Sequence, residues 1–397
     1  MTSLIRKMAG AFIPKKVVQW DVPLSGLEQV PRVIILSDHI DATYYATFHF
    51  PLQYLQAKGL LDFATMSSAG VGTCLSRMGT GEFVRHLVDR VAPHAVIFSR
   101  FATPSGNELL EMFRSFDVPT LYYCDDDLLS LPQSLGQGVL TAHGAKQVLE
   151  TRRACLTVAD RILVSSSYLA MVLSAQLPSQ RIDVLFYPPY LAPLITQTPK
   201  HGCQVEDKPV TIGYMGSKGH QQDLQIAVPA LVNVLKQFPM VRFETFGTIV
   251  MPEALLRFGE RVAAHAPRNS YKEFLQSLYD LRWEVGLAPL ADNTFNRCRS
   301  PIKFLEYTAC NITTVASDVS VYRSVMEAGG GFLVPDHDWD AALDHVVTDV
   351  PFRRMCLDHA REVCADQFSL PDVAAGLLAT LQVNQPNLGR KRCSGIS

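Results

Sequence analysis

The chain has 397 residues, enough for about two domains with sizeable apolar cores. Hydrophobic residues make up 48% and charged residues 19%, and the formal net charge of −2 argues against a broad nucleic-acid surface. Nine scattered cysteines without a CxxC pair fit reduced thiols and argue against a disulfide framework or a zinc site.

Residues 1–28 are predicted to form a basic N-terminal extension without the continuous apolar core of a signal peptide. Its basic residues are Arg6, Lys7, Lys15 and Lys16. No stretch reaches the roughly 18 apolar residues of a membrane span, so we expect a cytoplasmic protein. The basic residues could contact an anionic membrane surface, each contributing about 1 kcal/mol. A disordered tail is the alternative.

Residues 29–188 alternate short β-branched runs with helix-like stretches, which is typical of parallel α/β layers. The expected strands are 32–37, 95–99, 119–124, 161–165 and 182–186. The expected helices lie near 44–58, 80–91, 105–116, 140–159 and 167–176. The stretch 187–209 has five prolines and little periodicity, so residues 189–209 are the predicted linker.

The alternation restarts at residue 210 and predicts a second domain of similar size. The expected strands are 210–215, 241–246, 284–288, 312–316 and 331–334. The expected helices lie near 221–238, 252–265, 270–281, 301–310, 318–327, 339–348, 351–366 and 370–383. Two doubly wound domains with a hinge are therefore expected, with ligands bound outside the carboxyl ends of the strands.

The segment 299–306, Arg-Ser-Pro-Ile-Lys-Phe-Leu-Glu, is the predicted start of a helix suited to an anion. Ser300 is a favoured N-cap, and Pro301 suits the first helical position. Lys303 and Glu306 share one face, opposite a buried apolar face. The helix N-terminus and the lysine favour a phosphate, and the carboxylate could accept from two hydroxyls. The alternative is a solvated pair worth about 0.2–0.5 kcal/mol.

Glycines follow two strands of the second domain. The turn Gly213–His220 has three of them, which permit close approach of the backbone to a ligand before a helix N-terminus. Gly247 ends the next strand at the same sheet edge. The spacing matches neither a P-loop nor GxGxxG, and a plain strand-to-helix turn is the alternative. Lys218 and His220 could help to neutralise a phosphate or could simply be exposed.

Together these features resemble the donor domain of GT-B glycosyltransferases, especially the retaining enzymes of glycosyltransferase family 4 and their bacterial surface-polysaccharide relatives. The matching residues are Gly213–Leu224, Gly286–Leu290, Phe295-Asn296 and Ser300–Asp318, with Ala159–Ser166 in the first half. The resemblance implies an α/β, GT-B fold in which two doubly wound Rossmann-like domains face a central cleft. Its parts would be an acceptor domain at 29–188, a donor domain at 210–366, a helix crossing back at 367–384 and a tail at 385–397.

The resemblance also implies a nucleotide-sugar site. Glu306 matches the second glutamate of the E-x7-E motif, which binds the donor ribose, and Lys303 would lie by the donor phosphates. Cys298 stands where the first glutamate is expected, and the usual Gly-Arg…Lys clamp after the first donor strand is replaced. The implied donor-binding residues are Gly216, Ser217, Lys218, His220, Gly247, Ser300, Lys303 and Glu306.

Three adjacent carboxylates, Asp125, Asp126 and Asp127, follow the strand 119–124 and need solvent, a cation or hydrogen-bond donors to stay ionised. Asp-x-Asp is also the metal motif of GT-A glycosyltransferases, but the two-domain layout favours GT-B, where transfer usually needs no metal. We expect the cluster to hold acceptor hydroxyls, with Asp126 or Asp127 facing the reacting sugar and able to act as general base. A solvated turn that caps the next helix is the alternative.

Two further turns of the first domain are expected to reach the acceptor. In the resembling family the loop after the first strand approaches the donor phosphates and sugar, which makes Asp38, His39 and Tyr45 candidates. A surface histidine is the alternative for His39. Arg100, after the strand 95–99, could bind an anionic acceptor, pair with the aspartate cluster or pair locally on the surface.

The predicted function is transfer of a sugar from a nucleotide-diphosphate sugar to a hydroxyl acceptor, with retention, in glycan or polysaccharide biosynthesis. The expected catalytic residues are Asp126, Asp127 and Lys303, the last stabilising charge on the leaving diphosphate. No cofactor or metal is expected. The expected partners are a nucleotide sugar and a glycan or lipid-linked glycan acceptor. A degenerate GT-B protein acting as a sugar-nucleotide-binding scaffold and a GT-B sugar-nucleotide epimerase remain open alternatives.

Overall fold

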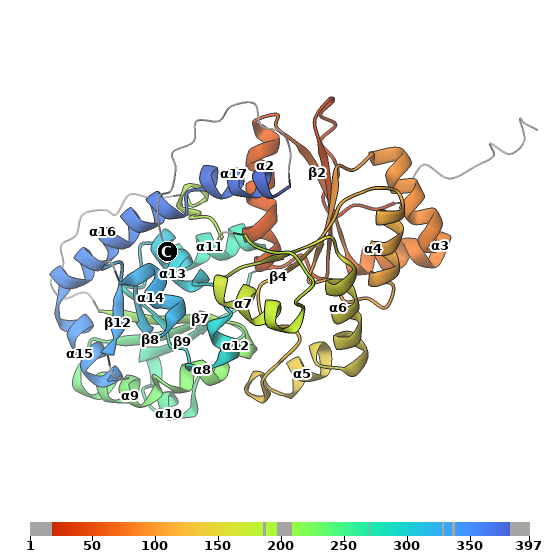
Figure 1. Cartoon of the computed structure of the whole chain (residues 1–397). Coiled ribbons are helices and arrows are strands. Elements are labelled where there is room, and N and C mark those ends of the chain that lie inside the picture. The colour runs from red at the N-terminus through yellow and green to blue at the C-terminus, as the bar shows by residue number, and fades with distance from the viewer. Residues whose placement is uncertain are drawn as a thin grey trace, which may run out of the picture.

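The first half of the chain forms a parallel sheet with helices on both faces (Figure 1). The computed structural model describes residues 18–185, 188–196, 209–268, 270–327, 329–335 and 338–381. The strands are β1 (Arg32–Ser37), β2 (Asp62–Ser67), β3 (Ala95–Ser99), β4 (Thr120–Cys124), β5 (Arg161–Val164) and β6 (Ile182–Val184). The helices are α1 (Ala42–Tyr44), α2 (Phe50–Ala57), α3 (Ser68–Val91), α4 (Gly106–Ser115), α5 (Gln137–His143), α6 (Lys146–Val158) and α7 (Ser167–Gln176).

The second half repeats this architecture with a second parallel sheet. Its strands are β7 (Thr211–Gly216), β8 (Arg242–Gly247), β9 (Val262–His265), β10 (Val285–Ala288), β11 (Thr313–Ser317) and β12 (Phe332–Val334). Its helices are α8 (Gln221–Gln225), α9 (Val228–Gln237), α10 (Glu253–Leu256), α11 (Tyr271–Asp280), α12 (Thr294–Arg297), α13 (Ile302–Ala309), α14 (Ser320–Met326) and α15 (Trp339–Thr348).

In both sheets the direction of winding reverses beside the first strand. The orders are β2-β1-β3-β4-β5-β6 and β12-β11-β10-β7-β8-β9. The reversals therefore lie between β1 and β3 and between β7 and β10, which are the places where doubly wound sheets bind ligands.

The strands form where apolar runs can be buried on both faces, as expected for parallel strands covered by helices. Along β1, Ile34 and Leu36 enter the core on one face, and Val33 and Ile35 enter the core on the other. This burial explains why the β-branched runs of the sequence predicted most strands to within a few residues.

Two strands, β2 and β9, are absent from the sequence-based expectation. Both are edge strands, and neither carries a long β-branched run. The helix expected over 252–265 is wrong in its second half, because α10 ends at Leu256 and the chain then forms β9. An edge strand is held by pairing with a single neighbouring strand, and the residue pattern within the edge strand does not reveal that pairing.

The last part of the predicted N-terminal extension lies against the edge strand β2. Val22 forms an antiparallel bridge with Thr65, and the carboxylate of Asp62 accepts hydrogen bonds from the amides of Ser25 and Gly26. These contacts cover an edge that would otherwise expose unpaired backbone groups. The four basic residues lie outside the described part of the chain.

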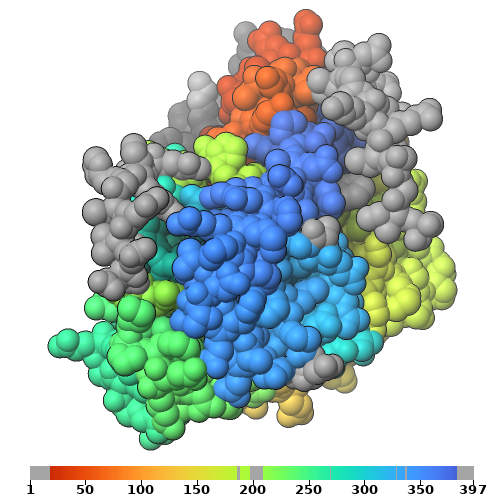
Figure 2. All heavy atoms as spheres, turned by 90° about the vertical axis from the view of Figure 1, so that its left-hand side faces the viewer, coloured from red at the N-terminus to blue at the C-terminus, as the bar shows by residue number. Residues whose placement is uncertain are grey.

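The C-terminal helices α16 (Val350–Gln367) and α17 (Leu370–Thr380) cross from the second domain back to the first. Figure 1 shows α17 beside α2, and Figure 2 shows this blue segment reaching from the second domain to the red and orange first domain. Leu377 and Leu378 pack there with Leu52 and Leu55 of α2. None of the described helices is long and apolar enough to cross a bilayer.

The described part of the expected linker, residues 188–196, also packs against the fold. Leu191 and Ile195 enter an apolar cluster with residues of both domains. The amide of Tyr190 donates to the carbonyl of Phe368 at 2.6 Å, just before α17. Residues 197–208 of the expected linker lie outside the described part of the chain.

Candidate functional site

A cavity of about 600 Å³ lies between the two domains, where the strand ends of both sheets face each other. One wall comes from the segments that follow β1, β3 and β4, and the other from those that follow β7, β8 and β10 together with α13. A cleft between domains is a common ligand site. The sequence-predicted residues that line it are Tyr45, Arg100, Asp125, Asp126, Gly216, Ser217, His220, Gly247, Ser300, Lys303 and Glu306.

Asp127 and Lys218 do not line this cavity. Asp127 is only 2% exposed, and its carboxylate accepts a hydrogen bond from the amide of Leu129, which turns it away from the cavity. Lys218 lies in a single exposed 3₁₀ turn, and its amide donates to the hydroxyl of Thr248. The tight turns that follow β4 and β7 therefore decide these two orientations, which adjacency in the sequence does not determine.

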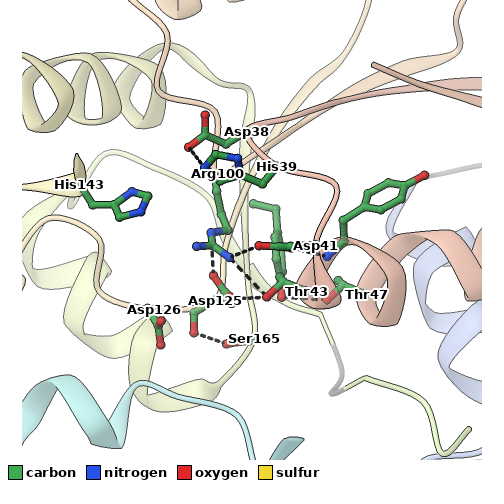
Figure 3. A network of polar contacts seen from close by, with 12 residues as sticks. Asp38, His39, Asp41, Thr43, Thr47, Arg100, Asp125, Asp126, His143 and Ser165 are labelled. Carbon is green, nitrogen blue, oxygen red and sulfur yellow. Dashed lines mark hydrogen bonds and ion pairs between the residues drawn. The ribbon is translucent and has the colours of Figure 1, made fainter. Parts of the chain in front are cut away.

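Asp38 and His39 also lie outside the cavity lining. Their side chains approach each other at 3.9 Å, and Figure 3 shows them on the side of Arg100 away from Asp41 and Asp125. The loop after β1 turns between residues 38 and 41, so its later residues face the cavity.

Arg100 is held within the first-domain wall. Its guanidinium Nη1 lies 3.4 Å from Asp41 and 3.3 Å from the hydroxyl of Thr43, and its Nε lies 3.5 Å from Asp125 (Figure 3). Asp125 is the main cause that raises the pKa of Arg100 above its ordinary value. The left-handed backbone of Arg100 (φ +56°) is held by an amide hydrogen bond to Tyr123. Arg100 therefore pairs with the aspartates.

Asp126 faces the second domain. Its Oδ1 lies 3.6 Å from Nε of Arg299, and Figure 3 shows it apart from the Arg100 group. Burial raises the pKa of Asp126 to about 6, while Arg299 opposes this shift. Such a carboxylate changes protonation near neutral pH, which suits a general base.

Arg299 was given no role in the sequence analysis, yet it contacts both walls. It belongs to the second domain, where Nη1 lies 3.1 Å from His220 Nδ1 and 3.5 Å from Asp223, and its guanidinium stacks over Phe295. It also reaches Asp126 of the first domain. Its position directly before the predicted helix start was the available signal, but its partners are distant in the sequence.

Lys303 lies on α13 with only 9% of its surface exposed. Nζ donates no hydrogen bond to a described residue and forms no ion pair with one, and the ammonium lies 5.7 Å from the ring centre of Tyr214. Burial, helped by Arg299, lowers the pKa of Lys303 to about 8. Burial and Lys303 together lower the pKa of His220 to about 3, which keeps the imidazole neutral.

The start of α13 differs from the expectation. Pro301 occupies the N-cap position, and Ser300 makes no capping hydrogen bond. The alternative of a solvated Lys–Glu pair is wrong, because Glu306 is only 8% exposed and does not pair with Lys303. The walls of the cavity cover this face of the helix, which helical periodicity cannot reveal.

Glu306 is held by an aromatic residue of α11. The hydroxyl of Tyr271 donates to Glu306 Oε1 at 2.7 Å, and burial raises the pKa of the carboxylate to about 7. Tyr45 of the first domain stacks parallel to Tyr271, with ring centres 6.5 Å apart. Glu306 is thus positioned where the two domains touch.

Gly216 and Gly247 end the neighbouring strands β7 and β8 and line the cavity together. Gly247 has φ +115°, and a Cβ atom there would lie 2.3 Å from the carbonyl oxygen of Gly216. Only glycine fits this position, because both the backbone conformation and the close approach exclude a side chain.

Cys298 is fully buried in the core of the first domain. Its thiol contacts the carbonyl of Thr294, and its own carbonyl accepts a hydrogen bond from Ser166 at the start of α7. Cys298 therefore docks the second-domain loop onto the first domain and does not substitute for a glutamate in the cavity.

Asp125, Asp126 and Asp127 point to three different partners: Arg100, Arg299 and the amide of Leu129. Within the described ranges, no group of three or more His, Cys, Asp or Glu side chains is arranged to hold a metal ion.

No family model matches the chain, and a search of curated proteins gives no match. Solved structures do match, over almost their whole length. HepE of Anabaena, solved with UDP, is 14% identical with a TM-score of 0.59, covering 88% of this chain and 99% of its own. The sucrose-phosphate synthase of Thermosynechococcus elongatus is 12% identical with a TM-score of 0.61, covering 89% and 98%. A UDP-forming α,α-trehalose-phosphate synthase of Burkholderia xenovorans, solved with glucose-6-phosphate, is 11% identical with a TM-score of 0.57, covering 89% and 100%.

This likeness confirms the predicted fold class. The chain is an α/β protein with the GT-B fold, in which two doubly wound domains face a cleft and the C-terminal helices cross back. At these identities the likeness establishes the architecture alone, and the narrower resemblance to glycosyltransferase family 4 stays a prediction.

Proposed function

We propose that the protein is a glycosyltransferase that moves a sugar from a nucleotide-diphosphate sugar to a hydroxyl acceptor. The observation that carries this proposal is Lys303, a buried ammonium that has no ionic partner among the described residues and lies beside Arg299 in an interdomain cavity. A buried charge without a counterion is costly, so such a group is kept where a ligand supplies the opposite charge. The solved complexes of HepE with UDP and with UDP-glucose support a nucleotide sugar as that ligand.

In this proposal the diphosphate lies between Lys303, Arg299 and the glycine backbone at Gly216. As the glycosidic bond to the leaving group breaks, negative charge grows on the diphosphate, and preorganised cations stabilise it. Glu306, held by Tyr271, accepts hydrogen bonds from the ribose hydroxyls. The two cations come from one short segment of the chain, so their spacing is set locally.

Asp126 would take the proton of the acceptor hydroxyl, because its carboxylate lines the cavity and faces the second domain. Contact between the walls through Tyr45 and Tyr271 would help to exclude water, which otherwise hydrolyses the donor. By resemblance we further propose a retaining, metal-independent reaction in cytoplasmic glycan or polysaccharide biosynthesis.

Calorimetric titration with UDP and UDP-glucose tests the donor site. Lys303→Ala should weaken binding by about 10–100-fold, because a hydrogen bond to a charged group contributes about 1.5–3 kcal/mol. Lys218→Ala is the matched control, since Lys218 is exposed and outside the cavity lining, and it should bind like the wild type. Equal affinity in the wild type and in Lys303→Ala would contradict the donor site.

Turnover separates the proposal from its alternatives. Release of UDP that depends on an added sugar acceptor supports transfer. Binding of nucleotide sugars without any release supports the scaffold, and isomerisation of the donor sugar without an acceptor supports the epimerase.

A further inference from the structure

The first-domain wall of the cavity carries more negative than positive side chains. Among the described residues, its charged lining residues are one arginine, Arg100, and three carboxylates, Asp41, Asp125 and Asp126. The described lining of the opposite wall has three cations, Lys303, Arg299 and Arg268, and one carboxylate, Glu306. The two walls therefore offer ligands opposite environments within one cavity.

Arg100 is not free to bind an anion. Its guanidinium is within 3.5 Å of the carboxylates of Asp41 and Asp125 and within 3.3 Å of Thr43 Oγ1, which itself donates to Asp125. An incoming phosphate would have to replace these carboxylates and would then lie beside them. Repulsion between like charges in a partly buried site opposes this arrangement.

Asp41 accepts hydrogen bonds from the amide of Tyr44 and from Arg100, and Oδ2 of Asp125 accepts one from Thr43, but other carboxylate oxygens on this wall accept none from described residues. Oδ1 of Asp125 is buried and accepts no hydrogen bond, and the carboxylate of Asp126 accepts none from the residues that the structure describes. Oδ1 of Asp125 faces Arg100, whereas the Asp126 side chain is 27% exposed and lines the cavity, so sugar hydroxyl groups can donate to Asp126. Independently, Lys303 across the same cavity is nine-tenths buried and has no ion pair within the described ranges, which indicates that the anionic part of the ligand lies on that wall.

We propose that the acceptor presents uncharged hydroxyl groups to the first-domain wall, and that this wall rejects sugar phosphates. The inference rests on the proposed function and narrows its acceptor class to neutral sugars and polyols. Arg100 acts as a positioning residue that holds Asp41 and Asp125 in place, and the donor wall alone accepts phosphate.

Titration with inorganic phosphate tests this wall directly. With the protein saturated with UDP, the melting temperature of the wild type should not rise with added phosphate. Asp41→Asn removes one of the two carboxylates that pair with Arg100 and leaves Asp125 in place, while asparagine keeps the capping of α1, where Asp41 accepts from the amide of Tyr44. Phosphate should bind this variant at least tenfold more tightly than the wild type, and the gain should vanish in Asp41→Asn/Arg100→Gln.

Two outcomes would overturn the inference. One is phosphate stabilisation of the UDP-saturated wild type that Arg100→Gln abolishes, and the other is no gain in Asp41→Asn. If UDP itself does not bind, the proposed function fails separately. The phosphate titration is then run on Lys303→Ala protein, in which the second wall has lost its buried ammonium.

A turnover comparison adds a second readout. Glucose and glucose 6-phosphate are supplied as matched acceptors with UDP-sugar donors. The rate of UDP release is measured, and the rate of release by hydrolysis without a sugar acceptor is subtracted. If either sugar reacts, UDP release should be at least tenfold faster with glucose than with glucose 6-phosphate. Faster release with the phosphorylated member would overturn the inference, and when neither sugar reacts the phosphate titration decides.

Discussion

The two walls of the interdomain cavity hold their charges in different ways. On the first-domain wall, Arg100 is surrounded by Asp41 and Asp125, so its charge is compensated within the protein. On the second-domain wall, Lys303 is buried more deeply than Arg100 and has no ionic partner among the described residues. A compensated charge stabilises the fold, whereas an uncompensated buried charge destabilises it unless a ligand binds. This difference indicates that the second-domain wall binds the anionic part of the ligand.

The walls also differ in what they are built from. The polar groups of the first wall are mainly side chains. The second wall has side chains and also exposes backbone to the cavity at Gly216 and Gly247. Arg299 joins the two, because it belongs to the second domain and reaches Asp126 of the first. Changes to the glycines or to Lys303 should affect the second wall more than the first, whereas a change to Arg299 should affect both.

The largest effect is expected from Gly247→Ala. The added Cβ would meet the carbonyl oxygen of Gly216 at 2.3 Å and would need a backbone conformation that alanine disfavours. We expect a loss of about 3 kcal/mol or more in the free energy of unfolding, measured by urea denaturation. Gly219→Ala is the control, since its Cβ would meet nothing closer than 3.8 Å. If both variants have the same free energy of unfolding, the close approach of the backbone at Gly247 does not matter for the stability of the second wall.

Arg299→Ala should disturb both walls at once. It leaves Asp126 and Asp223 without their shared cation, so we expect about 2 kcal/mol lower stability and at least tenfold weaker UDP binding. Arg299→Lys should recover part of both. Arg297→Ala, in the same segment but exposed and paired with Asp292, should leave UDP affinity unchanged. If Arg299→Ala weakens only stability, Arg299 links the domains without touching the donor.

UDP affinity should depend on pH through Lys303. Its pKa of about 8 means that the ammonium is half charged near pH 8, almost fully charged one pH unit below and mostly neutral one pH unit above. Because a diphosphate prefers the charged form, binding should be strongest below about pH 8 and weaken by up to tenfold per pH unit above it. Calorimetry across this range checks the slope. Lys303→Arg should remove the slope, since arginine stays protonated, and a flat wild-type profile would refute the assignment.

The smallest effect is expected from Tyr271→Phe. It removes the hydrogen bond to Glu306 and leaves a buried carboxylate less well held, so UDP affinity should fall by about fivefold, or about 1 kcal/mol. Tyr54→Phe, on α2 and outside the cavity lining, is the matched control. Unchanged affinity in Tyr271→Phe would show that Glu306 does not depend on this contact.

Much of the fold was predictable because its signals are local. The apolar runs of β1 and β3 were expected with the bounds that the structure has, since each is buried on both faces. The edge strands β2 and β9 were not, because their conformation depends on a neighbour distant in the sequence. In the site, Lys303 and the glycine pair were expected from the helix start and strand ends that carry them.

The sequence by itself determined two α/β domains, a glycine-lined sheet edge and a lysine in the first turn of a helix at that edge. Only the tertiary structure decided that Lys303 and Glu306 are buried, that Arg299 reaches Asp126, and that Cys298 lies in the other domain's core. It also decided that Asp125 and Asp127 face different partners. The physical reason is that burial and ion pairing depend on which distant segments meet, whereas helix and strand patterns repeat within a few residues.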